Sequence, residues 1–139
     1  MNKIEEDENR KEDKIEEIEI FIQHLESVLP LDFESYKSDF RIKAICERYF
    51  EKIVEAVIDL AFIYIKEKEL RMPENEEQTF DILKNTGIIS EELCFNLKDA
   101  KSMRNFIIHR YGKINDNLVF HAVTEQLIPD VTKFLEALK

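Results

Sequence analysis

Glycine and proline are scarce in this sequence, with only two glycines and three prolines among 139 residues. An average protein contains about 7% Gly and about 5% Pro. A fold built from many short strands depends on tight turns, which these residues make most readily. Their shortage therefore argues against a β-rich fold and favours a few long helices joined by a few loops.

Cysteine is equally rare. Cys46 and Cys94 are the only two, and neither lies in a CxxC pair or at zinc-finger distance from a histidine. We therefore expect two buried free thiols in a reducing compartment, with neither a disulfide nor a metal site.

Long apolar runs are also missing. The longest nearly apolar segment, Ala56–Ile65, is interrupted by Asp59, whereas a membrane span takes about 20 residues. The N-terminal segment is charged and lacks the apolar stretch of a signal peptide. These features predict a cytoplasmic protein without a membrane partner.

Charge is unevenly distributed along the chain. The net charge is −10, which argues against a general nucleic-acid coat protein because phosphate binding needs Lys and Arg. Residues 1–20 carry nine acids and four bases, whereas residues 98–113 carry five bases and only Asp99 as an acid. A solvated helix face would explain such a basic cluster, and so would a phosphate-binding segment.

Apolar residues recur at steps of three and four over most of the chain, which is the period of an amphipathic helix. We expect helices over 15–29, 38–69, 79–85 and 90–111, and a last helical stretch from 116 that Pro129 interrupts. Residues 31–37 read as a connection. The 38–69 segment is apolar on two faces and should be central. The predicted fold is all-α, an up-and-down bundle of four to five helices.

The helix ends carry capping signals. Ser90 followed by two acids predicts an N-cap, and Asp116 is the expected cap of the last helical stretch. Gly87 and Gly112 are the expected stops of the two preceding helices. The sequence predicts one domain over 15–139, preceded by a charged and frayed extension over 1–14.

Arg104 lies in the middle of the apolar stripe of the 90–111 helix. Its neighbours on that stripe are apolar: Leu93, Leu97, Ala100 and Ile107. A guanidinium in such a position is costly unless it is paired or faces a site or a partner. Position alone favours neither alternative: a structural ion pair and a functional arginine both remain open.

His109 follows five residues later and has polar neighbours. Asn105 lies one turn before it on the same helix face, where an amide can hold an imidazole in one tautomer. Arg110 and Tyr111 follow directly. His24 and His121 lack such neighbours, and we expect them to be ordinary structural or surface groups.

The stretch Arg104–Tyr111, with four residues between Arg and His and one between His and Tyr, resembles the signature of the HEPN superfamily, and more narrowly of the HepT toxins. Further similarity lies outside the motif, at Glu47–Arg48, Pro73, Gly87–Ser90 and Ile114–Asp116. Together these features cover residues 40 to 139. The acidic N-terminal extension is less typical of that family.

The resemblance implies an α-helical, homodimeric, metal-independent endoribonuclease that needs no cofactor. The family's catalytic pair falls on Arg104 and His109, its polar residue on Asn105 and its tyrosine on Tyr111. The implied partner is a small nucleotidyltransferase antitoxin, which uses ATP and Mg²⁺ to attach AMP to that tyrosine. The implied substrate is RNA, with tRNA among the candidates. The basic residues expected to bind RNA are Lys98, Lys101, Arg110 and Lys113.

The chemistry of these residues suits RNA cleavage without the family. An imidazole can take or give a proton at neutral pH, and a guanidinium holds phosphate oxygens bidentately. Asp99 is the only acid from 93 to 115, so no carboxylate set for Mg²⁺ accompanies the motif. An alternative from another class is a non-catalytic HEPN module that binds nucleotides or a nucleotidyltransferase. A purely structural bundle is a third.

The spacing of Arg104 and His109 constrains the assembly. Five residues apart, they point about 140° away from each other on a regular helix. One site can use both only if the helix distorts near its end or if two such helices converge. A two-fold dimer that packs this helix against its copy would bring both pairs into one cleft.

Overall fold

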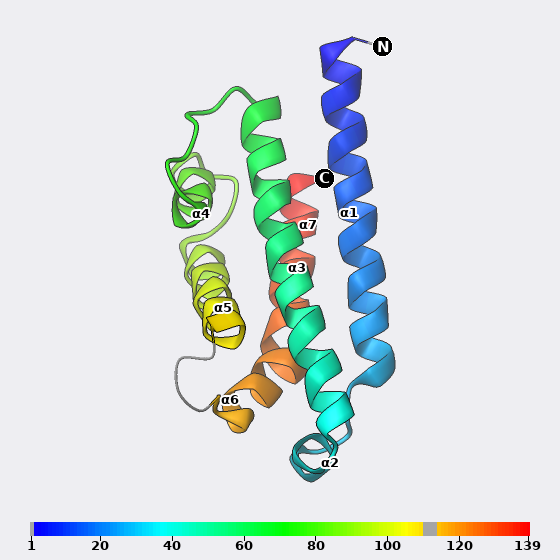
Figure 1. Cartoon of the computed structure of the whole chain (residues 1–139). Helices are drawn as coiled ribbons and strands as arrows, with labels where there is room; N and C mark the ends of the chain where they lie inside the picture. Colours follow the sequence, from blue (N-terminus) through cyan, green and yellow to red (C-terminus); the bar gives the residue numbers. More distant parts are fainter. Residues whose placement is uncertain (1, 110–113) are drawn as a thin grey trace.

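The computed structural model describes residues 2–109 and 114–139, and this part of the chain is helical with short connections (Figure 1). These described residues form seven α-helices and one π-helical segment, in the order α1 Lys3–Val28, α2 Phe33–Ser38, α3 Phe40–Glu67, α4 Glu76–Asn85, α5 Glu91–His109, α6 Asp116–His121, η1 Ala122–Gln126 and α7 Leu127–Leu138. The all-α bundle predicted from the sequence is confirmed. None of these helices is long and apolar enough to cross a membrane.

Helix α3 is the centre of the bundle, as its two apolar faces predicted. It packs against α1 on one side and against α4 and α5 on another, and it also contacts α2 and α7. Ten of its residues are buried: Cys46, Phe50, Ile53, Val54, Ala56, Val57, Ile58, Leu60, Ala61 and Ile65.

Both cysteines are free and buried, and burial raises the pKa of the Cys46 thiol to about 11. The two thiols are therefore core residues, protonated at neutral pH.

Helix α1 begins at Lys3, twelve residues before the apolar stripe begins. The frayed extension expected over 1–14 is thus helical from Lys3 onward. The Asn2 side chain caps the helix by accepting from the Glu5 N–H, at 2.9 Å. Farther along, the Lys11 ammonium pairs with Glu67 at 3.6 Å. Interhelical ion pairs of this kind extend the contact with α3 beyond the apolar stripe, which apolar periodicity alone cannot reveal.

Two connections differ from their predictions. Residues 31–37 were expected to be a connection, but the short helix α2 begins within them at Phe33 and ends at Ser38. It is capped by Asp32 and anchored by the fully buried Tyr36, whose ring packs against Phe33 and Phe120. The predicted cap Asp116 is instead the first residue of α6. Asn115 caps that helix, and Asp116 accepts a hydrogen bond from the Lys43 ammonium at 2.9 Å.

Pro129 does not interrupt the last helical stretch. The helix widens before it, over Ala122–Gln126, where the Leu127 N–H donates to the Ala122 carbonyl five residues back. A proline in a regular helix lacks one N–H and collides with the carbonyl four residues earlier. The π-helical turn absorbs that defect, so α6, η1 and α7 follow one another without a break.

Candidate functional site

Helix α5 carries the Arg104 and His109 pair, and its start is fixed as the sequence predicted. The Ser90 side chain accepts from the Leu93 N–H at 3.0 Å, and Gly87 has the left-handed φ of +80° that stops α4 just before it. Leu93, Leu97 and Ile107 are buried, which seats α5 against α3, α4 and α7. The rotation of α5 about its axis is therefore determined by its apolar stripe.

Arg104 lies inside that stripe and is only 6% exposed. Its Nη2 donates to Glu76 Oε1 at 2.8 Å and to Asn105 Oδ1 at 2.7 Å, and its Nε donates to the same Asn105 oxygen at 3.1 Å. Glu76 is the first residue of α4. The charged group at the centre of an apolar face is thus paired and hydrogen-bonded, as burial of a charge requires.

Asn105 was expected to orient His109. The hydrogen bonds of its Oδ1 are to Arg104, so this side chain holds the guanidinium of the residue before it. The expected role of Asn105 in orienting His109 stays a prediction. Glu76, in contrast, is a site residue that sequence reasoning missed. It is 28 residues away from Arg104, and only the packing of α4 on α5 brings the two together.

His109 is exposed and is the last residue of α5. From Glu91 to His109 the helix is α-helical without a break, so Arg104 and His109 project about 140° apart. The distortion that would turn both into one site is therefore not present up to His109. His109 instead shares the solvent face of α5 with Phe95, Ser102 and Phe106.

The expected RNA-binding residues have different environments. The Lys98 ammonium lies 3.0 Å from Asp81 and 3.7 Å from Glu77, and the hydrogen bond with Asp81 raises the pKa of Lys98. Lys98 thus joins α5 to α4 and has its charge largely compensated. Lys101 is half-buried. Arg110, Tyr111, Gly112 and Lys113 lie outside the described residues.

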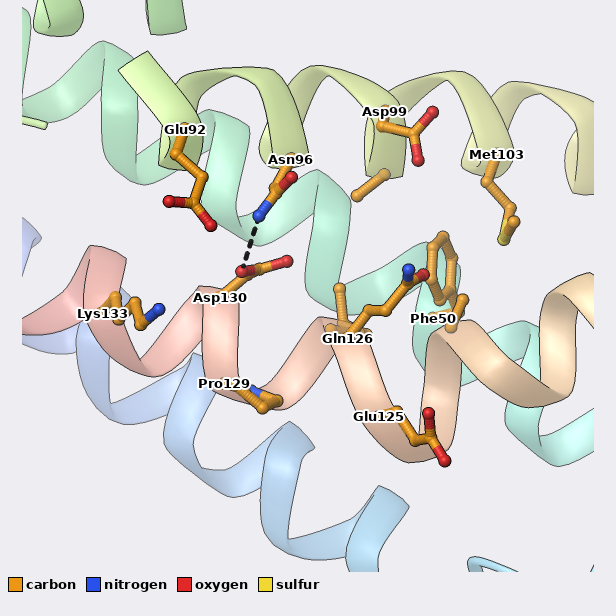
Figure 2. A pocket seen from close by; sticks show the side chains of 13 residues that line it. Phe50, Glu92, Asn96, Asp99, Met103, Glu125, Gln126, Pro129, Asp130 and Lys133 are labelled. Carbon is orange, nitrogen blue, oxygen red and sulfur yellow. Dashed lines mark hydrogen bonds between the residues drawn. The ribbon is translucent and has the colours of Figure 1, made fainter. Parts of the chain in front are cut away.

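A cavity of about 290 Å³ lies on another face of α5, toward η1 and α7 (Figure 2). Four of the side chains around it are carboxylates: Glu92, Asp99, Glu125 and Asp130. The Asn96 amide donates to Asp130 at 3.2 Å, and burial raises the pKa of that carboxyl. Among the described residues, Lys133 is the only cation lining the cavity. Because the charged side chains around the cavity are acids except for Lys133, it is unsuited to RNA phosphates.

The face of α5 around Phe106 is apolar. A groove of about 380 Å³ lies between α5 and α6, and it is lined mainly by Met103, Phe106, Ile107, Ile114 and Leu118. Phe106 and Leu118 are 50% and 57% exposed, and Phe95, near the start of α5, is 70% exposed. Large exposed apolar groups gathered beside one helix often mark an interaction surface.

Three comparisons relate the chain to known proteins. The profile of the family described as Ribonuclease HepT-like matches residues 15–138. The chain is 28% identical over 126 residues to the mRNA nuclease HepT of Shewanella oneidensis, covering 91% of this chain and 93% of that protein. It is 26% identical over 113 residues to the tRNA nuclease HepT of Aphanizomenon flos-aquae, covering 81% and 77%.

Solved structures show the same fold. The tri-AMPylated HEPN toxin of Shewanella oneidensis, in complex with its MNT antitoxin, superimposes with a TM-score of 0.84 at 26% identity, over 99% of this chain and 97% of that chain. A crystal structure of a toxin–antitoxin with AMP-PNP matches equally well, with a TM-score of 0.84 at 27% identity over the full length of both chains.

Proposed function

Because this chain belongs to the ribonuclease HepT-like family of the HEPN superfamily and is therefore an endoribonuclease, we propose that Arg104 and His109 cut RNA as the active residues of a toxin. The observation that carries the proposal is the buried Arg104 on α5, held in place by Asn105 and Glu76, with an exposed His109 at the end of the same helix. Relatives that form toxin–antitoxin complexes support the toxin role.

The proposed reaction uses the nucleophile that RNA itself provides. The His109 imidazole takes the proton of a 2′-hydroxyl, and the resulting oxygen attacks the adjacent phosphorus. The bond from phosphorus to the 5′ oxygen breaks, and that oxygen receives a proton from an imidazolium. The Arg104 guanidinium stabilises the negative charge that builds up on the phosphate oxygens. The products are a 2′,3′-cyclic phosphate and a 5′-hydroxyl.

We propose that this chemistry needs no metal ion. Among the described residues, no group of three His, Cys, Asp or Glu side chains lies close enough to hold one. Proton transfer by the imidazole and charge stabilisation by the guanidinium provide the two functions that a bound metal often supplies.

The active site is proposed to be shared between two copies of the chain. Within one chain, Arg104 points toward α4, whereas His109 is exposed at the end of α5. A second copy is therefore needed to bring an arginine and a histidine to the same phosphate. The exposed Phe95, Phe106 and Leu118 provide apolar surface for that contact. A two-fold arrangement would also bring the two basic segments together along the RNA.

The proposed partner is a small nucleotidyltransferase that silences the enzyme by attaching AMP to Tyr111. The related Shewanella oneidensis toxin is AMPylated and bound to its MNT antitoxin, which supports this assignment. The bulky anion, two residues from His109, would compete with RNA for Arg104. The transfer consumes ATP and releases pyrophosphate.

Cleavage of RNA by the purified protein tests the proposal. His109→Ala should lower the cleavage rate by about 10²–10⁴-fold, because general acid–base catalysis contributes that much. Arg104→Lys should not restore the activity lost in Arg104→Ala, since the planar fork is lost. His121→Ala, an exposed histidine on α6, is the matched control and should cleave normally.

Chelation tests the metal-independent part of the proposal. Activity should survive excess EDTA. Loss of cleavage with the chelator and its return with Mg²⁺ would contradict that part alone. A His109→Ala protein that cuts at the wild-type rate would contradict the site.

A further inference from the structure

Glu76 contacts the Arg104 guanidinium from a different helix. Its Oε1 lies 2.8 Å from Arg104 Nη2, and it joins the first residue of α4 to the C-terminal half of α5. The Arg104 side chain is 8% exposed, whereas that of Glu76 is 45% exposed. The pair therefore lies at the edge of the core, with the carboxylate on the solvent side.

The hydrogen bonds of Arg104 occupy one side of its guanidinium. Nε and one N–H of Nη2 donate to Asn105, and the second N–H of Nη2 donates to Glu76. Within residues 2–109 and 114–139, Nη1 has no hydrogen-bond partner. It is also not one of the fully buried, unpartnered side-chain atoms found there, which are Tyr36 Oη and Glu67 Oε2. The two N–H donors of Nη1 thus have no partner in the described part of the chain.

The backbone of Glu76 is itself held firmly. Asn75 caps α4 by accepting from the Gln78 N–H at 2.9 Å, and the Gln78 side chain accepts in turn from the Glu74 N–H at 2.8 Å. These two hydrogen bonds close a loop around the first turn of α4. The Glu76 carboxylate therefore projects from a fixed point, which suits a group that orients another side chain.

We propose that Glu76 is a positioning residue for RNA cleavage. Together with Asn105 it fixes the guanidinium plane, so that the two Nη1 donors face the scissile phosphate. Glu76 remains in place when RNA is bound and acts only through Arg104. The inference rests on the proposed function of Arg104, and it adds a residue that the sequence motif does not contain.

Steady-state cleavage kinetics test the role of Glu76. Glu76→Ala should lower kcat by about 10- to 100-fold, since a small misplacement of a catalytic group costs about that much. KM should stay the same or fall, because one negative charge near the RNA is lost. Glu76→Gln keeps an oxygen acceptor and should recover part of kcat. Glu74→Ala removes the same charge two residues earlier and should leave kcat unchanged.

Glu76→Asp separates position from charge. It keeps the carboxylate but is one methylene shorter, so it cannot reach Nη2 without a shift, and kcat should fall in this variant too. If Glu76→Ala does not fold, kcat of the Glu76→Asp variant still tests the positioning role of Glu76. An Asp variant with wild-type kcat would overturn the proposal.

Two other outcomes have distinct meanings. A Glu76→Ala protein with unchanged kcat and a lower KM than Glu74→Ala would show that Glu76 competes with RNA for Arg104, which overturns the positioning role. A wild-type protein that cuts no RNA would overturn the proposed function itself. The two failures are therefore distinguishable.

Discussion

Arg104 combines two demands on a single side chain. It lies in the buried stripe of α5, and its guanidinium donates to Asn105 and Glu76 through Nε and Nη2. Removing one partner of a buried charge is costly, because the other charge is then left uncompensated. An arginine held in this way is preorganised for phosphate, and it needs little rearrangement when RNA binds.

Tyr111 is the residue through which we expect the enzyme to be switched off. A phenol ionises near pH 10, so it has no obvious proton-transfer role at neutral pH. Tyr111→Phe should therefore retain most of the RNA-cleavage activity. After incubation with the cognate nucleotidyltransferase, ATP and Mg²⁺, intact-mass measurement should find AMP on the wild type and none on the variant.

The modified wild type should have lost its activity, and the treated Tyr111→Phe protein should keep it. Tyr64→Phe, a tyrosine on α3 away from the motif, is the control and should be modified like the wild type. A mass increase that persists in Tyr111→Phe would contradict the assignment. So would a fully modified wild type that still cuts RNA.

Among the elements, α3 depends on the carboxylate at its start. Asp39 Oδ1 accepts from the Arg41 N–H at 2.9 Å and from the Ile42 N–H at 3.4 Å. The hydrogen bond from the Arg41 N–H is the main cause that lowers the pKa of Asp39 below its ordinary value. The Arg41 side chain and the Ile42 N–H lower it further. The charged form is therefore favoured in the folded state.

Asp39→Ala should lower the melting temperature at neutral pH. A lowered pKa means that the stabilisation is present above the ordinary value of about 4 and is lost as the pH falls through the lower folded value. The difference in Tm between wild type and variant should therefore shrink in acid. Thermal unfolding followed by circular dichroism between pH 7 and pH 2 measures it.

Asp99→Ala provides the comparison for that experiment, because Asp99 is an exposed acid in the middle of α5. It should change Tm little at either pH. A difference between wild type and Asp39→Ala that stays constant down to pH 2 would contradict a role for the charged cap.

At the scale of the whole molecule, the exposed surface of α5 and α6 is where we expect the second copy to bind. Phe106→Ser removes an aromatic ring from this surface and should shift the protein from dimer toward monomer in sedimentation velocity. Leu31→Ser changes a fully exposed apolar residue between α1 and α2 and should leave the dimer intact.

Both variants should keep the wild-type helix content, because neither side chain is buried. Cleavage by Phe106→Ser should recover at high protein concentration if the site is shared between two copies. A wild type that sediments only as a monomer at micromolar concentration would contradict the shared site.

The sequence by itself determined the helical class, the central position of α3 and the direction of Arg104 into the stripe of α5. Each of these depends on local periodicity and capping, which act over a few residues. Ser90 and Gly87 were readable as a cap and a stop for the same reason. The stretch Arg104–Tyr111 and the pattern around it were likewise readable from local sequence, and the family that they indicated together is confirmed by the match over residues 15–138.

Only the tertiary structure decided what surrounds those residues. Two ion pairs, Arg104 with Glu76 and Lys98 with Asp81, join α5 to α4. The start of α1 lies outside the apolar stripe, and there Lys11 pairs with Glu67 of α3. The π-helical turn before Pro129 lets the packed helix continue past a residue that lacks an N–H and collides with an earlier carbonyl. Sequence rules treat such a proline as a helix break. Long-range ion pairs and such accommodations depend on how the helices pack, and no local pattern encodes that packing.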